Sequence, residues 1–246
     1  MRLKRIKSES CCYHVITRGT GKQIVFEDDM DYHVFLKKLR EYSEKWKMSI
    51  LCYCLMSNHV HMILYDKSSR ISDFMHDVCM SYAIYYNKKY NHCGHVFEGR
   101  FKSFPIEDEG YLDTAFLYII RNPQIAGICR YDVYQWSSFP DYILGKGPTD
   151  TRYMLKRYGG ILALRHLLEN EAGRECEEYD TPAKNPDEEI RKFLKDEWGI
   201  LNPSEISSLS KEERDKVIIS LREHGYSMRG TARLSGVSYG IIQRIR

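Results

Sequence analysis

The sequence predicts an α+β protein, built from an antiparallel sheet with helices on one face and followed by a smaller all-α region. β-prone runs and helical patterns alternate in the order β-α-β-β-α-β-α over the first 145 residues, whereas only helical patterns follow residue 186. The composition, 43% apolar and 29% charged, supplies enough apolar residues for a buried core and excludes a disordered or fibrous chain.

The first half of the α+β region is predicted to contain a strand, a helix and a hairpin. Tyr13–Thr17 is a short β-branched run that ends in a glycine-containing turn. Over Asp28–Lys47, apolar residues recur every three or four positions, which predicts an amphipathic helix. Met48–Leu55 and Val60–Tyr65 are β-prone runs separated by four residues, so they predict an antiparallel hairpin.

The second half is predicted to add two helices and a strand. A helical pattern covers Ile71–Lys89, an extended run covers Arg100–Ile106, and a further helical pattern covers Glu109–Arg121. We expect this last helix to stop before Pro123, because proline disfavours helical conformation in the residue that precedes it. The resulting order is that of a ferredoxin-like split β-α-β domain.

The chain is predicted to divide into three parts. Residues 1–145 form the α+β domain, residues 146–185 form a helical connector and an acidic linker, and residues 186–246 form a helical C-terminal domain. The linker is inferred from Glu169–Glu189, which contains nine acidic and two basic residues together with two prolines. A segment of this charge and composition is expected to be solvated.

The C-terminal domain shows the pattern of a helix-turn-helix. An amphipathic helix is expected over Lys211–Glu223, a short helix over Met228–Leu234, and a basic helix over Tyr239–Arg246 after a glycine-containing turn. In such units the last helix enters the major groove of duplex DNA. The residues expected to contact DNA there are Ser238, Tyr239, Gln243 and Arg244. A helical packing module without DNA binding is the alternative.

Basic residues gather at both ends of the chain. The net charge is only +3, but the first seven residues include four cations: Arg2, Lys4, Arg5 and Lys7. This distribution favours a polyanionic partner, although ordinary solvated surfaces would give the same pattern. No apolar run approaches the ~20 residues that cross a bilayer, and no export signal is recognisable. We therefore expect a cytoplasmic protein without membrane contact, whose eight cysteines are free thiols.

Two histidines in one predicted strand form a candidate metal site. His59 and His61 are two residues apart, so their side chains project from the same face of the strand, while Val60 projects from the other. Neutral imidazole is a common ligand of divalent transition metals. The alternative is a pair of ordinary, half-buried histidines.

The third predicted helix supplies a candidate nucleophile and a third ligand. Tyr118 and Asn122 are four residues apart and share one helical face. The amide oxygen of Asn122 is a hard donor that could complete a His-His-Asn site. A tyrosine phenol could attack a phosphate with help from a metal ion. Because phenolate is a good leaving group, the bond formed between the phenol oxygen and the phosphate can later be reversed. Tyr118 could instead be an aromatic residue of the core. Tyr111 lies on the same helix face, so which of the two tyrosines is the nucleophile stays open at this point.

Cations and aromatic residues are interleaved in residues 94–103. Arg100 and Lys102 flank an aromatic residue, and this combination is typical of surfaces that bind single-stranded nucleic acid. We expect both cations to contact DNA. In the alternative, the aromatic residues Phe97 and Phe101 belong to the core and only the two cations are free.

Five motifs, spread in order over Ser8–Leu144, together resemble the HUH single-tyrosine transposases, and most closely the branch of REP-associated tyrosine transposases. The motifs are Tyr13-His14-Val15 with Thr17-Arg18-Gly19, Cys54-Leu55-Met56-Ser57-Asn58-His59-Val60-His61, Gly94-His95-Val96-Phe97-Glu98-Gly99-Arg100-Phe101-Lys102-Ser103, Tyr118-Ile119-Ile120-Arg121-Asn122-Pro123 and Trp136-Ser137-Ser138.

The resemblance implies a metal-dependent enzyme that cleaves single-stranded DNA and transfers the strand through a 5′-phosphotyrosine intermediate. His59, His61 and Asn122 would then hold Mg²⁺ or Mn²⁺, and Tyr118 would be the nucleophile. The expected partner is single-stranded or hairpin DNA, and Arg18 and Arg121 join the expected DNA contacts. The helix-turn-helix is not part of the family core, and it extends the expected partners to duplex DNA.

Two other functions remain open from the sequence. The first is a domesticated transposase that binds specific or regulatory DNA sites with little catalysis. The second is a metal phosphodiesterase that uses water, in which Tyr118 is only structural. The intact set of two histidines, a tyrosine and an asparagine favours the transposase, since a protein kept only for binding needs no nucleophile. We expect a monomer rather than a homodimer.

Overall fold

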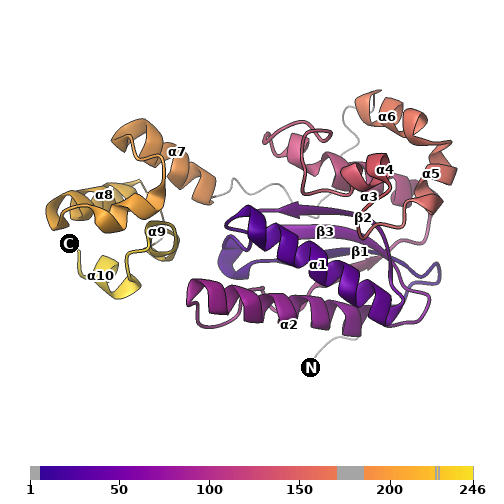
Figure 1. Cartoon of the computed structure of the whole chain (residues 1–246), viewed down its shortest axis with the longest axis horizontal. Coiled ribbons are helices and arrows are strands. Elements are labelled where there is room, and N and C mark those ends of the chain that lie inside the picture. The colour runs from indigo at the N-terminus through magenta and orange to yellow at the C-terminus, as the bar shows by residue number, and fades with distance from the viewer. Residues whose placement is uncertain (1–5, 171–185, 225, 227, 246) are drawn as a thin grey trace. The chain divides into compact units, whose positions relative to one another are not determined.

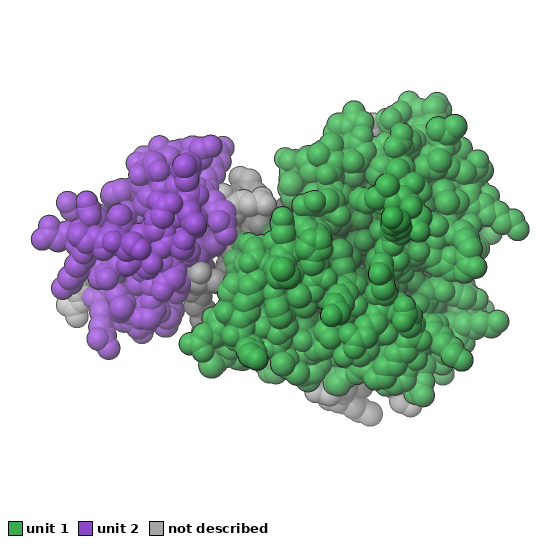
Figure 2. Space-filling model, viewed as in Figure 1, with its two compact units in different colours: residues 1–179 green, residues 180–246 purple. Residues whose placement is uncertain are grey.

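The computed structural model describes residues 6–170, 186–224, 226 and 228–245. The chain forms two compact units, Met1–Tyr179 and Asp180–Arg246, which Figure 2 shows in different colours. Within the described residues, no helix has both the length and the apolar character needed to cross a membrane. The seven cysteines in this part of the chain are free thiols.

The first unit contains the predicted β-α-β-β-α-β-α order (Figure 1). A short 3-10 helix, η1, follows the first strand, and three further helices follow the last helix of this order. The elements are β1 (Cys12–Arg18), η1 (Thr20–Lys22), α1 (Asp29–Trp46), β2 (Ser49–Met56), β3 (His59–Tyr65), α2 (Ile71–Tyr90), β4 (Lys102–Pro105), α3 (Glu109–Ile125), α4 (Phe139–Leu144), α5 (Arg152–Tyr158) and α6 (Ile161–Asn170).

The sheet has four antiparallel strands in the order β2-β3-β1-β4. β2 and β3 form the predicted hairpin, and β3 lies in the centre of the sheet beside β1. In the pairing of β1 with β3, Arg18 lies opposite His59 and Ile16 lies opposite His61. The predicted α+β class with an antiparallel sheet is therefore confirmed.

Helices cover both faces of the sheet, which differs from the expected arrangement on one face (Figure 1). Tyr53 and Leu55 of β2 are buried in the core beneath α1 and α2. The alternate residues Cys52 and Cys54 are buried in a second core, which includes the apolar face of α3. Because β2 is apolar on both faces, each face must be covered to remove it from water.

Helix α3 continues through Pro123, so the prediction that it stops before this residue is wrong. Proline removes one backbone donor and crowds the preceding turn, which normally costs a helix about 3 kcal/mol. Here Ile119 and Pro123 are buried, and the backbone N–H of Ala126 donates to the carbonyl of Asn122 at 2.9 Å. Packing and this next bond keep the last turn helical, and Asn122 consequently lies inside the helix, one turn after Tyr118.

The first unit extends beyond the expected end at residue 145. Met154, Leu164 and Leu168, from α5 and α6, are fully or almost fully buried in the same core as α3. Their burial makes residues 146–170 part of this unit. The remainder of the expected connector, residues 171–185, lies outside the described residues.

The second unit is helical and has its own core. Its elements are α7 (Pro186–Trp198), the 3-10 helix η2 (Pro203–Ser208), α8 (Lys211–Glu223), α9 (Met228–Ser235) and α10 (Tyr239–Arg244). Ile206, Ile218 and Ile242 are each fully buried, and they come from η2, α8 and α10. The core of this unit therefore contains side chains from most of its elements, and one face of α10 is buried in that core.

The loop after β1 holds the turn between β2 and β3. The backbone N–H of Gly19 donates to the carbonyl of Asn58 at 2.8 Å, and the N–H of Val25 donates to the carbonyl of Ser57 at 2.8 Å. A side-chain carbon at Gly19 would lie 2.2 Å from the carbonyl oxygen of Gln23. This close approach of two backbone segments is possible only with glycine, and it fixes the position where β3 begins.

We expect Gly19→Ala to lower the free energy of unfolding of the first unit by about 1–3 kcal/mol, because the added methyl group overpacks a backbone contact. Gly110→Ala is the control, since its added carbon would meet only a side-chain oxygen of Asp108, at 3.3 Å. Urea unfolding of both variants measures the effect. Equal stability of the two variants would contradict the proposed close packing.

Candidate functional site

The two histidines of β3 lie on the sheet face that α3 covers. Val60 and Met62 point into the core beneath α1 and α2, so the alternating His59 and His61 point to the opposite side. The imidazole ring centroids are 5.0 Å apart and the rings are nearly perpendicular, at 85°. His59 is 6% exposed and His61 is fully buried. The strand thus brings the predicted pair together.

Helix α3 places Tyr118 beside this pair. The Tyr118 ring lies edge-to-face on the ring of His61, with centroids 5.7 Å apart at 85°. Tyr118 is 8% exposed, and Asn122, one turn further along the helix, is 5% exposed. The helix meets β2 and β3 through buried side chains such as Phe116. The predicted nucleophile and the histidine strand therefore come together, although they are 57 residues apart in the chain.

Burial keeps both histidines neutral. It lowers the pKa of His59 to about 3, and the nearby Arg18 guanidinium adds to this shift. Burial also lowers the pKa of His61 well below its usual value, with smaller contributions from His59, His14 and Arg18. Neutral imidazole is the form that binds metal ions, because one of its ring nitrogens carries a lone pair.

Each histidine has one ring nitrogen engaged by a neighbour. Nδ1 of His59 is 2.6 Å from the side-chain oxygen of Asn58. Nδ1 of His61 is 3.1 Å from Nε2 of His14. Nε2 of His61 is buried and has no hydrogen-bond partner. A buried nitrogen without a partner is costly, and a cation would satisfy it, so these residues fit a divalent metal ion.

The expected basic residues lie in different surroundings. Arg18 is half-buried at the end of β1, close enough to lower the pKa of both histidines, and Arg121 is half-buried on α3. The other expected cations of the first unit are exposed, namely Lys7, Arg100 and Lys102, whereas Arg2, Lys4 and Arg5 lie outside the described residues.

Phe97, one of the aromatic residues interleaved with cations in residues 94–103, belongs to the core. It is 8% exposed and lies in the cluster beneath α1 and α2, and Phe101 packs against the same cluster. The alternative interpretation of the sequence therefore fits these two residues. Arg100 and Lys102 of the same segment are exposed.

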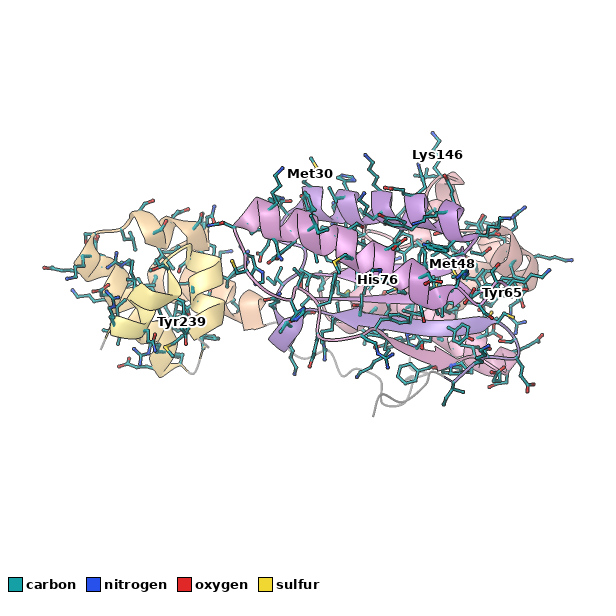
Figure 3. All side chains as sticks on the ribbon, turned by 90° about the horizontal axis from the view of Figure 1, so that it is seen from below. Met30, Met48, Tyr65, His76, Lys146 and Tyr239 are labelled. Atoms are coloured by element: carbon teal, nitrogen blue, oxygen red, sulfur yellow. The ribbon has the colours of Figure 1, made fainter. Side chains whose placement is uncertain are left out.

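Four expected DNA-contact residues lie on the exposed side of α10 or at its start. They are Ser238, Tyr239, Gln243 and Arg244. Ile242 faces the core instead, and Gly236, at φ +69°, forms the turn that separates α9 from α10. Figure 3 labels Tyr239, which is 41% exposed.

Sequence reasoning missed the neighbours of the two histidines. The spacing of residues along the chain indicates no role for His14 or Asn58, yet each contacts a ring nitrogen of the pair. Asn58 could have been noticed because it precedes His59 directly. His14 required knowledge of which strands pair, since it is a diagonal neighbour of His61 across β1 and β3.

The first unit matches known transposases. The model of the family described as "Transposase IS200 like" matches residues 7–122. A solved structure of a REP-associated tyrosine transposase bound to a REP hairpin has a TM-score of 0.50 and 12% identity, covering 58% of this chain and 86% of its own. A structure from Deinococcus radiodurans R1, assigned as a transposase, has a TM-score of 0.35 and 16% identity, covering 46% and 92%. No curated protein matches the sequence.

The matched segment starts before β1 and ends at Asn122, so it contains the histidine strand, Tyr118 and the asparagine. The structure bound to the REP hairpin supports the same fold for this region. Residues 7–122 are therefore similar to the IS200-like transposase family, and the first unit shares its fold with a REP-associated tyrosine transposase.

Proposed function

We propose that this protein cleaves and rejoins single-stranded DNA through a covalent bond between Tyr118 and a 5′-phosphate. The observation that carries this proposal is the contact of the Tyr118 ring with His61, whose Nε2 is buried without a partner. The ring of the candidate nucleophile thus contacts the ring of a candidate metal ligand, and phosphoryl transfer to a tyrosine needs both groups at one site.

We propose His59, His61 and Asn122 as the residues that hold the ion, Mg²⁺ or Mn²⁺. The histidines would bind through Nε2, because Nδ1 of each is occupied by Asn58 or His14. The amide oxygen of Asn122 would supply the hard donor. When bound, the ion would polarise the phosphate and offset charge that develops during cleavage.

The chemical step would exchange one phosphodiester bond for another. The phenol oxygen of Tyr118 would lose its proton and attack the phosphorus, and the bond to the 3′-oxygen would break. The released 3′-oxygen would take up a proton to become a hydroxyl, and a second 3′-hydroxyl could later reverse the reaction on the adduct. A free tyrosine with a pKa of about 10 is roughly 4 kcal/mol from ionisation at pH 7. The positive charge of Arg18 would favour both the phenolate and the phosphate.

DNA would reach this site along the exposed cations of the first unit. Arg100 and Lys102 lie at the start of β4, at the edge of the sheet, where they would contact the backbone phosphates. Because the similar solved structure holds a REP hairpin, we propose hairpin DNA as the partner of this chain. Lys7 and the preceding basic residues would add contacts to the hairpin.

The second unit would bind duplex DNA through α10. Its exposed polar side chains surround one buried residue, Ile242, as expected for a recognition helix that is anchored from behind. This unit supports the alternative function, a domesticated transposase that binds regulatory or specific DNA sites with little catalysis. The two functions differ in whether a covalent adduct forms.

Tyr118→Phe is expected to abolish the covalent adduct, because the phenol oxygen is the attacking atom. The adduct is measured by incubating the full chain with single-stranded hairpin oligonucleotides and Mn²⁺, followed by denaturing electrophoresis. Tyr111→Phe is the matched variant and should still form the adduct. An adduct that persists in Tyr118→Phe would reject Tyr118 as the nucleophile. If no oligonucleotide forms an adduct with the wild-type protein, the binding function is favoured.

Removal of the cation is expected to stop cleavage. Chelation with EDTA should prevent adduct formation, and added Mn²⁺ should restore it. His61→Ala should lower the rate on the order of 100-fold at limiting Mn²⁺, because a ligand nitrogen is lost. His166→Ala, at an exposed position on α6, is the control and should behave as wild type. Full activity of the protein in EDTA would exclude a metal-dependent step.

Arg244→Ala is expected to weaken binding to duplex DNA and to reduce the salt dependence by about one counterion, since one phosphate contact is lost. Lys195→Ala, which removes an exposed cation from α7, should leave binding unchanged. Fluorescence anisotropy at several salt concentrations measures both effects. Equal losses for the two variants would mean that α10 is not the contact helix.

A further inference from the structure

His14 is a buried histidine with no part in the proposed chemistry. It lies in β1 and is fully buried. Its Nε2 is 3.1 Å from Nδ1 of His61, and its Nδ1 is 3.5 Å from the hydroxyl of Tyr111. The side chain thus connects a proposed ligand to a tyrosine near the start of α3.

The sheet geometry creates this contact. Ile16 is paired with His61, so His14 is the diagonal neighbour of His61 on the same face. The two imidazole centroids are 5.4 Å apart. Phe104, which is paired with His14 across β4, packs against the same ring at 6.2 Å. Strands on both sides therefore hold the His14 ring in place.

The hydrogen bonds distinguish two arrangements of protons. If His61 donates from Nδ1–H to His14, then His14 carries its proton on Nδ1, where the Tyr111 oxygen can accept it. This leaves a lone pair on Nε2 of His61. In the opposite arrangement, Nε2 of His61 would carry a proton, and that buried nitrogen has no acceptor. A buried donor without an acceptor is unfavourable, whereas a lone pair can be satisfied by a cation.

We propose that His14 is a positioning residue that accepts the Nδ1–H of His61 and so directs the Nε2 lone pair of His61 towards the cation. The inference rests on the proposed function for the identity of the ligand. His14 is not itself a ligand of the same ion, because it meets His61 at Nδ1 while the ion would bind at Nε2. Partners of this kind fix the tautomer and orientation of a ligating histidine.

Binding of Mn²⁺ to the full chain, measured by isothermal titration calorimetry without substrate, tests the proposal. His14→Leu removes the acceptor and should weaken Mn²⁺ binding about 10- to 100-fold. His14→Gln offers an amide oxygen at the position of Nε2 and should restore binding to within about threefold of wild type. Unchanged affinity in the folded His14→Leu protein would overturn the proposal.

The matched control is His76→Leu, which removes an exposed histidine of α2 (Figure 3) and should leave Mn²⁺ binding unchanged. Equal losses in His76→Leu and His14→Leu would show a nonspecific effect and overturn the proposal. Circular dichroism reports whether each variant is folded.

Long-range ¹⁵N NMR of the metal-free wild-type protein gives a second readout that needs no variant. The proton of His61 should reside on Nδ1, and a proton on Nε2 would overturn the proposal even if His14→Leu fails to fold. If the wild-type protein binds no Mn²⁺, the proposed function fails, and the position of this proton alone decides on His14.

Discussion

The antiparallel pairing of β1 with β3 is the constraint on which the site depends. It sets Arg18 opposite His59 and brings His14 diagonally next to His61. A shift of one residue in this register would turn His14 to the other face of the sheet, because side chains alternate along a strand. The hydrogen bond from the backbone N–H of Gly19 to the carbonyl of Asn58 fixes the same register where β1 ends and β3 begins. This backbone contact therefore helps to keep the histidine side chains in their positions.

Burial gives the histidine pair its chemical character. Burial lowers the pKa of His59 to about 3 and the pKa of His61 well below its usual value, so both rings are neutral and can donate a lone pair. Neutral ligands give a cation no compensating charge, and in the proposed reaction the DNA phosphate supplies it. Helix α3 closes the site from above the sheet, and its passage through Pro123 places Asn122 on the same helical side as Tyr118.

Local sequence patterns predicted the helices and strands well, but they predicted the end of α3 and the cover of the sheet less well. The hairpin of β2 and β3 and the amphipathic helix α1 follow from residue periodicity within short windows, which is why the sequence predicted them. The continuation of α3 past Pro123 depends on burial by distant residues, which no local rule contains. The cover on both faces of the sheet likewise depends on α3 packing against β2, a contact between residues about 60 positions apart by sequence order.

The sequence by itself determined that His59 and His61 share a face, because the strand period is a property of the local backbone. Only the tertiary structure decided that α3 continues past Asn122, that the ring of Tyr118 contacts the ring of His61, that His14 contacts His61, and that Nε2 of His61 is buried without a partner. The reason is physical: strand pairing and the packing of α3 join segments that are distant in the chain, and their outcome depends on the whole core rather than on any one segment.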